Sequence, residues 1–263
     1  KVIPMKADGT LDWSKELLTE STRIVAVNHV SNALGTINPV KRIIADAHAK
    51  GAQVLIDGAQ SGPHMAIDVQ GLDADYYCLS GHKVYGPTGI GVLYGTLDRL
   101  KELPPYQGGG DMIKEVRFEG TTYAEPPFKF EAGTPNIAGA VALGAAFDFM
   151  ASVGVERIAR HEESLRKMGE EALMGIEGLK IYGTAENKAS VISFLIGTNH
   201  PYDTGVLLDQ MGIAIRTGHH CTQPIMDYYD IPGTARASFA AYNTEEEVLK
   251  FVDGVKRVAQ MLQ

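Results

Sequence analysis

A strand–helix–strand pattern near the start of the chain limits the fold more than any other feature. Residues 21–27 and 53–57 are short apolar runs typical of buried strands, and residues 39–50 between them carry apolar side chains at helical spacing. Gly51 follows as a helix stop. Two strands joined by a crossover helix lie parallel in one sheet. We therefore expect an α/β fold whose mainly parallel sheet is flanked by helices.

Polar side chains follow two of the apolar runs, at 53–57 and 76–79. In an α/β sheet, ligands bind beyond the carboxyl ends of the parallel strands. We therefore expect the polar side chains after these runs to meet at one edge of the sheet. They are Asp57, Gln60, Ser80, His82 and Lys83.

The chemistry of these side chains suits one cofactor. A lysine beside apolar strands loses its proton more readily than a solvated one and can form a Schiff base with an aldehyde. A buried aspartate needs a cationic partner. Pyridoxal phosphate satisfies both, because its aldehyde takes Lys83 and its protonated ring nitrogen takes Asp57. Ser80 and His82 would then donate to the phosphate, and Gln60 to the ring hydroxyl. An ordinary salt bridge between Lys83 and Asp57 is the alternative, which the whole set disfavours.

A second reactive segment spans residues 216–224 and follows an expected strand at 213–216. Pro224 suits the first turn of a helix, which places Cys221 just ahead of the helix N-terminus. The helix dipole and the neighbouring His219 and His220 favour a thiolate, so we predict a nucleophile. The spacing does not fit a closed zinc site, and no metal is expected. A loop cysteine without a task remains the alternative.

Two further residues stand in apolar strands. Arg236 lies within the expected strand 234–239 and must find an anion there, either a substrate carboxylate or a structural carboxylate. Cys78 lies within 76–79 and is expected to be an inert core thiol.

The composition changes after residue 134. Asn136 is a plausible cap for a small-residue helix to about 152, and Gly154 separates it from a charged helix at 155–176. Thr244 and Glu247 form the capping-box pattern of the last helix. We predict a cofactor-binding domain at 1–134 and a smaller α+β domain at 135–263. Further strands are expected at 179–182, 189–196, 213–216 and 234–239.

Two glycine-containing stretches are less regular. Residues 85–94 lack the spacing of a dinucleotide-binding loop and precede a strand, so we reject that function and expect an edge strand at 89–94. Residues 104–128 are polar and glycine-rich, and we expect a long functional or disordered loop.

The gross composition excludes some partners. The 263 residues carry a net charge of −8, which argues against nucleic-acid binding. No apolar run reaches the length of a membrane span. Two cysteines give no disulfide framework, so we expect a cytoplasmic protein.

Five motifs, in this order along the chain, resemble those of SufS-type cysteine desulfurases. These enzymes are relatives of selenocysteine lyase among the class V aminotransferases, which have the pyridoxal-phosphate-dependent transferase fold type I. The short loop before Cys221 favours this subgroup over the NifS and IscS type. The motifs are Asp57-Gly-Ala-Gln60, Ser80-Gly-His-Lys83, Phe130-Glu-Ala-Gly-Thr-Pro-Asn136, Arg216-Thr-Gly-His-His-Cys221 and Arg236-Ala-Ser-Phe239.

The resemblance implies a role for each matched residue. Lys83 would bind the cofactor and later move the proton on the substrate Cα. Cys221 would attack the sulfur of the bound cysteine, which leaves a persulfide and releases alanine. The resemblance further implies cofactor contacts at Asp57, Gln60, Ser80, His82 and, for the partner subunit of a homodimer, Thr134. It implies substrate-carboxylate contacts at Asn32, Arg236 and Arg216.

Members of this family are longer at the N-terminus, where they carry a threonine-rich phosphate loop and a histidine that stacks on the cofactor. His29 lies beside Asn32 and does not match that histidine. We expect this chain to be the C-terminal part of a desulfurase that supplies sulfur for iron–sulfur clusters through an acceptor of the SufE or SufU kind. The alternatives are a selenocysteine lyase, another class V aminotransferase, or a catalytically incomplete fragment.

Overall fold

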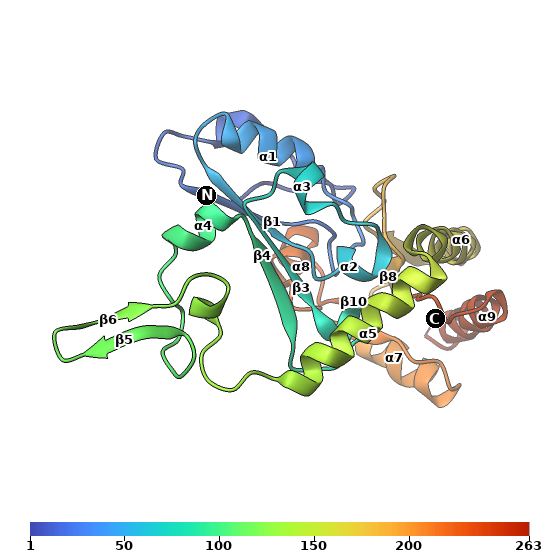
Figure 1. Cartoon of the computed structure of the whole chain (residues 1–263). Coiled ribbons are helices and arrows are strands. Elements are labelled where there is room, and N and C mark those ends of the chain that lie inside the picture. Colours follow the sequence, from blue (N-terminus) through green and yellow to red (C-terminus); the bar gives the residue numbers. More distant parts are fainter. Residues whose placement is uncertain (263) are drawn as a thin grey trace.

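The computed structural model describes residues 1–262 and has an α/β architecture with two four-stranded sheets (Figure 1). The first sheet has the order β1-β2-β3-β4, in which β1, β2 and β3 are parallel and the edge strand β4 is antiparallel. The expected mainly parallel sheet is confirmed. Its strands are β1 (Ile24–Asn28), β2 (Gln53–Asp57), β3 (Tyr76–Ser80) and β4 (Gly91–Gly95).

Helix α1 (Val40–His48) covers one face of this sheet, as the apolar spacing predicts. Its buried side chains, Ile43 and Ile44 among them, pack with Val54 and Ile56 of β2 in one core cluster. Short helical elements complete this half of the chain. They are η1 (Lys15–Leu17), α2 (Ser61–His64), α3 (Val69–Leu72), η2 (Gly81–Lys83), α4 (Leu97–Glu102) and η3 (Phe128–Phe130).

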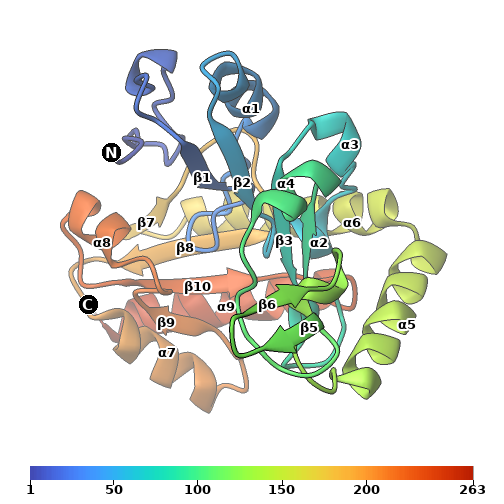
Figure 2. The same cartoon turned by 60° about the vertical axis from the view of Figure 1, so that its left-hand side comes forward.

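The second sheet is antiparallel and has the order β7-β8-β10-β9. Figure 2 shows its long strands running across the ends of the first sheet. The capping box of α9 is present, with Thr244 accepting from the backbone N–H of Glu247. The elements are α6 (Val155–Met174), β7 (Leu179–Tyr182), β8 (Val191–Ile196), α7 (Pro201–Gln210), β9 (Arg216–Gly218), α8 (Gln223–Tyr229), β10 (Thr234–Ser238) and α9 (Glu245–Met261).

Helix α5 (Ile137–Val153) leads from the first sheet to α6. Asn136 caps it by accepting from the N–H of Gly139, and Gly154 ends it with φ of 92°. Its Leu143 and Met150 pack on Val84, beside the first sheet. Helix α5 belongs to the predicted second domain, 135–263, but packs on the first, 1–134. The predicted division into these two domains stays a prediction.

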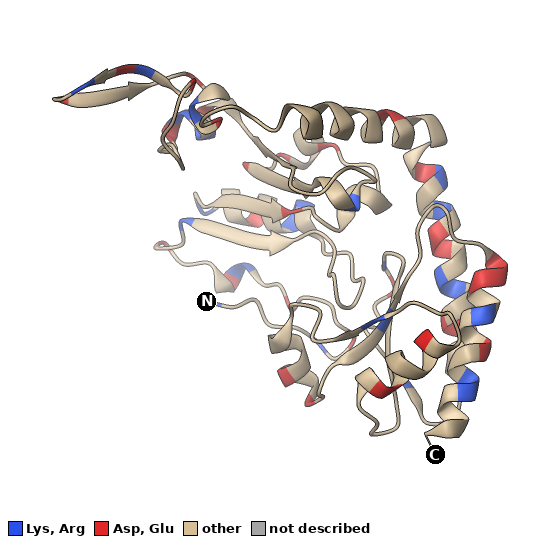
Figure 3. Ribbon diagram, turned by 90° about the horizontal axis from the view of Figure 1, so that it is seen from below, with Lys and Arg blue, Asp and Glu red and all other residues tan. Residues whose placement is uncertain are grey.

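The consecutive helices α5 and α6 differ in their content of charged side chains. Helix α6 is studded with acidic and basic side chains, whereas α5 carries only Asp148 (Figure 3). No single helix among residues 1–262 is long and apolar enough to cross a membrane, although α5 and α6 pass that test jointly, on length and composition, across a bend of 74°.

The sequence predicts a long loop, functional or disordered, at residues 104–128, and it misses the regular structure in this segment. These residues contain an antiparallel hairpin, β5 (Ile113–Arg117) and β6 (Gly120–Tyr123), which projects from the body of the molecule (Figure 1). Both strands are exposed along their whole length. They bury no face, so they lack the alternation of apolar and polar residues by which a strand is predicted.

One strand boundary and the burial of one cysteine also differ from expectation. The strand expected at 213–216 is β9, which begins at Arg216 because only that end pairs with β10. Cys78 is half-buried and not a core thiol, since its Sγ lies 4.0 Å from Asp57 Oδ1 at the carboxyl end of the sheet.

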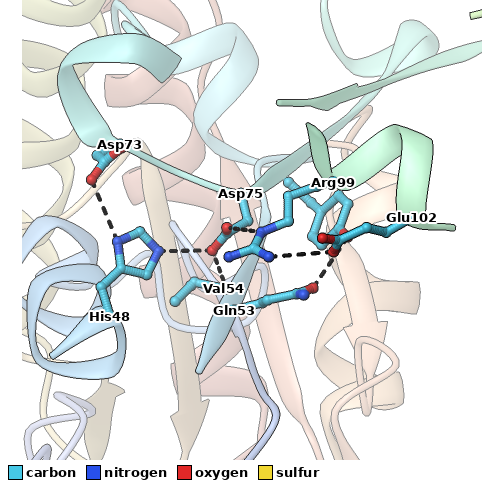
Figure 4. Close-up of polar contacts among 8 residues, drawn as sticks. His48, Gln53, Val54, Asp73, Asp75, Arg99 and Glu102 are labelled. Atoms are coloured by element: carbon cyan, nitrogen blue, oxygen red, sulfur yellow. Dashed lines mark hydrogen bonds and ion pairs between the residues drawn. The ribbon is translucent and has the colours of Figure 1, made fainter. Parts of the chain in front are cut away.

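A charged network holds the opposite, amino end of β2 and β3 (Figure 4). The buried Asp75 accepts hydrogen bonds from His48 Nε2 at 2.7 Å, the N–H of Val54 at 2.7 Å and Arg99 Nε at 2.8 Å. Burial raises the pKa of Asp75, but the bonds from Arg99, His48 and Val54 outweigh it and hold the pKa below 3.8. The ionised carboxylate thus ties α1, β2 and α4 together.

We predict that Asp75→Asn lowers the free energy of unfolding by about 2 kcal/mol at pH 7, because buried donors lose a charged acceptor. A depressed folded-state pKa stabilises above the unfolded-state value, so the difference from wild type should persist above pH 4 and shrink as the pH falls further. Urea denaturation across this range measures it. Asp73→Asn, at an 84% exposed side chain facing the same His48, is the matched control and should change stability by less than about 0.5 kcal/mol.

Candidate active site

The carboxyl ends of β2 and β3 bring Asp57 and Lys83 to one edge, as the sequence predicts. The two strands pair in parallel with Asp57 opposite Cys78, and Lys83 follows β3 in the short helix η2. Asp57 is exposed, and not buried as the sequence analysis expects, because it is the last residue of β2; its Oδ1 accepts from the N–H of Ala59 at 2.9 Å. No cationic side chain within residues 1–262 forms an ion pair with Asp57 within 4.0 Å.

The amine of Lys83 is half-buried, and its charge is disfavoured. Burial lowers the pKa of Lys83, Asp57 opposes this, and the cations of Arg236 and Arg216 lower it further. These residues come from both sheets, so the charge of this amine depends on side chains of both. A lysine with a lowered pKa offers a larger neutral fraction and is a better nucleophile.

Three of the remaining predicted cofactor residues lie close to the ends of β2 and β3 in the sequence, and the fourth, Thr134, lies in a separate segment. Ser80 Oγ and His82 Nδ1 lie 2.9 Å apart at the carboxyl end of β3, and Gln60 precedes α2. Thr134 is exposed in the segment before α5. None of the hydrogen bonds formed by residues 1–262 joins its side chain to the others, so its predicted role toward a second subunit stays a prediction.

Arg236 lies in β10 directly opposite Arg216 in β9. Like charges at opposed positions destabilise a sheet unless an anion joins them. Arg236 Nη1 donates to the carbonyl of Asn32 at 2.6 Å, whereas its Nε is buried and has no hydrogen-bond partner among residues 1–262. Burial and Arg216 lower the pKa of Arg236, and Cys221 opposes them. The arginine pair is thus suited to a carboxylate ligand.

Asn32 connects this arginine to the cysteine loop. Its Nδ2 donates to the carbonyl of His220 at 2.6 Å, which uses one of the two N–H groups of the side-chain amide. The backbone carbonyl of Asn32 accepts from Arg236, and its side-chain amide donates to the cysteine loop. The structure therefore brings together all three residues predicted to hold a substrate carboxylate.

Cys221 is exposed and belongs to a strained loop. His220 and Cys221 have φ of 54° and 61°, the left-handed region that side chains other than glycine rarely adopt. The His220 ring anchors the loop, because its Nε2 lies 3.0 Å from the carbonyl and 2.9 Å from the hydroxyl of Thr234. This anchoring role was not evident from the sequence, which does not reveal that His220 is buried.

The expected contribution of His220 to a thiolate is wrong. Burial above all, then the cations of Arg236 and Arg216, lower the pKa of His220 to about 4, so the ring is neutral at physiological pH. Arg216 is the cation beside the sulfur, with Nη2 at 3.8 Å from Sγ. The sequence offered a signal, since Arg216 opens the same motif five residues earlier. Helix α8 begins two residues after the cysteine with Pro224 in its first turn, as the sequence predicts, and Thr222 at its N-cap position makes no capping side-chain hydrogen bond.

Cys78 is chemically distinct from Cys221. Burial and the neighbouring Asp57 carboxylate raise the pKa of Cys78, so it stays a protonated thiol. Within residues 1–262, no group of three or more His, Cys, Asp or Glu side chains is arranged to hold a metal ion. The candidate nucleophiles are thus Lys83 and Cys221.

We predict that Arg216→Gln raises the pKa of Lys83, because it removes one of the two cations that disfavour its charge. Lys83 should then react more slowly with an amine-acylating reagent near pH 8, as measured by peptide mass spectrometry. Arg257→Gln, at an exposed position on α9, is the control and should leave the rate unchanged. A rate for Lys83 equal in wild type and Arg216→Gln would contradict the electrostatic coupling.

Comparison with known proteins gives consistent matches. The family described as aminotransferase class V matches residues 1–251. A cysteine desulfurase of Serratia proteamaculans is 52% identical over the whole chain, which spans 65% of that protein's length. The apo structure of a Thermococcus onnurineus cysteine desulfurase has a TM-score of 0.95 at 40% identity, over 99% of this chain and 66% of that one. The cysteine desulfurase CsdA of Escherichia coli has a TM-score of 0.90 at 41% identity, over 94% and 61%.

Proposed function

This chain belongs to the class V aminotransferase family, and we propose that it provides the catalytic lysine and cysteine of a pyridoxal-phosphate-dependent L-cysteine desulfurase. The observation that carries the proposal is the position of Lys83. Its half-buried amine is coupled to Asp57 on one side and to Arg236, Arg216 and Cys221 on the other. The charge of the lysine that would bind the cofactor is thus influenced by the cations suited to a carboxylate and by the candidate sulfur nucleophile.

The residues present fit pyridoxal phosphate. Asp57 offers an anion without a cationic partner among the described residues, and Lys83 offers an amine with a lowered pKa. When bound, the cofactor supplies an electron sink for charge that develops on the substrate Cα. Asp57 would hold the ring nitrogen, Gln60 the ring oxygen, and Ser80 with His82 the phosphate. Thr134 would reach the phosphate of the partner subunit in a homodimer.

The substrate carboxylate would lie on the opposed arginines. Arg236 and Arg216 face each other across β10 and β9, and a carboxylate between them relieves their repulsion. Asn32 would lie beside the substrate carboxylate, because it contacts both Arg236 and the cysteine loop. Lys83 would take and return the proton on the substrate Cα.

Cys221 would receive the sulfur. An S–S bond forms between Cys221 and the sulfur of the bound cysteine, and the C–S bond of the substrate breaks. Its electron pair remains on the substrate carbon, which takes up a proton and leaves as alanine. Arg216 Nη2, 3.8 Å from Sγ, would lie beside the attacking sulfur.

The persulfide would pass to an acceptor protein of the SufE or SufU kind, for iron–sulfur cluster assembly in the cytoplasm. The two free cysteines are compatible with a reducing compartment. The exposed position of Cys221 allows an acceptor to reach it. The chain spans 65% of the length of a curated relative, so the activity of the whole protein is part of the proposal.

The cofactor assignment is tested by absorbance. The chain mixed with pyridoxal phosphate should show a visible band of a lysine-bound cofactor, and Lys83→Ala should abolish it. Lys114→Ala, in the exposed hairpin strand β5, is the control and should retain it. A band that survives in Lys83→Ala sinks the assignment, and no band in the wild-type chain favours a catalytically incomplete fragment.

The nucleophile is tested by Cys221→Ala. This variant should keep the visible band yet reduce persulfide formation from L-cysteine to background, because it lacks the attacking sulfur. Cys78→Ala is the matched control and should remain active. Activity on selenocysteine should suffer less in Cys221→Ala, and a chain that uses selenocysteine alone would instead be a selenocysteine lyase. Equal sulfide release by wild type and Cys221→Ala would overturn the proposal and favour another class V reaction.

A further inference from the structure

A buried tyrosine lies directly behind the aspartate of the site. Tyr77, in β3, is 1% exposed, and its ring packs against the backbone just after Asp57. A Cβ added at Gly58 would lie only 1.9 Å from ring atom Cε1 of Tyr77. Gly58 therefore has to be glycine, and the ring sets how closely the turn that follows Asp57 approaches β3.

The hydroxyl of Tyr77 lies in a chain of three polar contacts. It is 2.8 Å from His29 Nδ1 and 2.5 Å from Ser61 Oγ, and Ser61 Oγ lies 3.0 Å from the carbonyl of Gly58. The N–H of Gly62 also donates to that carbonyl, at 2.9 Å. The chain of contacts thus runs from the end of β1, through β3, to the turn that carries Asp57.

Only one direction of donation satisfies every contact. The carbonyl of Gly58 can only accept, so Ser61 donates to it and must accept from Tyr77. The single hydroxyl hydrogen of Tyr77 is then used, so His29 donates from Nδ1 to the tyrosine oxygen. The reverse direction leaves Ser61 and Gly58 facing each other without a hydrogen between them, which costs a buried hydrogen bond.

His29 suits this arrangement. Its side chain is buried, and burial lowers its pKa to about 4, so the ring is neutral at physiological pH. A neutral imidazole has one N–H, and the chain of contacts assigns it to Nδ1. His29 is therefore the first donor in this series of hydrogen bonds, and it donates from Nδ1 to the hydroxyl oxygen of Tyr77.

We infer that Tyr77 is a positioning residue: through Ser61 and the carbonyl of Gly58, it fixes the turn that aims the Asp57 carboxylate at the ring nitrogen of the cofactor. The inference rests on the proposed function, because it concerns the same aspartate. The alternative is that Tyr77 is a core tyrosine that only packs, with its hydroxyl hydrogen-bonded. The two differ in whether Tyr77 and Asp57 are energetically coupled.

The experiment is a double-mutant cycle on cofactor affinity. Tyr77→Phe keeps the ring against Gly58 and removes only the hydroxyl, and it should weaken pyridoxal phosphate binding by about five- to tenfold. In the Asp57→Asn background the same change should have little further effect, because the aimed carboxylate is already gone. An equal loss in both backgrounds would overturn the inference.

Tyr76→Phe is the matched control. It removes a hydroxyl from the neighbouring residue of the same strand, where Tyr76 donates to Gln53 at the amino end of β2. Its affinity for the cofactor should equal that of wild type. A loss as large as that of Tyr77→Phe would mean that any tyrosine hydroxyl of β3 acts through general stability, and would contradict a positioning role.

A second readout needs no cofactor. The ¹⁵N resonances of His29 should identify the Nδ1–H tautomer in wild type, and Tyr77→Phe should shift the ring toward the Nε2–H form. An Nε2–H tautomer in wild type would contradict the direction of donation. If wild type binds no pyridoxal phosphate, the proposed function fails, and the tautomer still decides whether the chain of contacts exists.

Discussion

The parallel pairing of β2 with β3 decides where the chemistry of this molecule lies. It sets Asp57 opposite Cys78 and brings the loops that follow both strands to one edge. Lys83 is placed by the first turn after β3. At the other end of the same strands, Asp75 ties α1, β2 and α4 together, so the pairing is held at the end away from the site.

The second sheet converts this edge into a site for an amino acid. Arg236 and Arg216 are opposed in β10 and β9, and both disfavour the charge of Lys83. Asn32, just after β1, contacts Arg236 with its backbone and the Cys221 loop with its side chain. One residue in the loop after β1 thus contacts both the arginine and the cysteine loop. The desolvated lysine, the arginine pair and the sulfur depend on the two sheets keeping this contact.

Strands and helices with a buried face could be predicted from the sequence, because burial imposes a period on the apolar residues. The strand at 53–57 and the helix from Val40 to His48 are examples. The hairpin within 104–128 could not, since neither of its strands buries a face. The residue types of the site likewise revealed Lys83 and Cys221. They did not reveal that His220 is neutral, because its pKa depends above all on burial, and on Arg236, which the pairing of β10 with β9 brings close.

The central claim is that Lys83 is the one amine that this fold prepares for an aldehyde cofactor. The most direct test is to incubate the chain with pyridoxal phosphate, fix the adduct with borohydride and map the modified lysine by peptide mass spectrometry. The label should concentrate on Lys83, whose pKa is lowered by burial and by two arginines. A label spread over exposed lysines, or one absent from Lys83, would contradict the account.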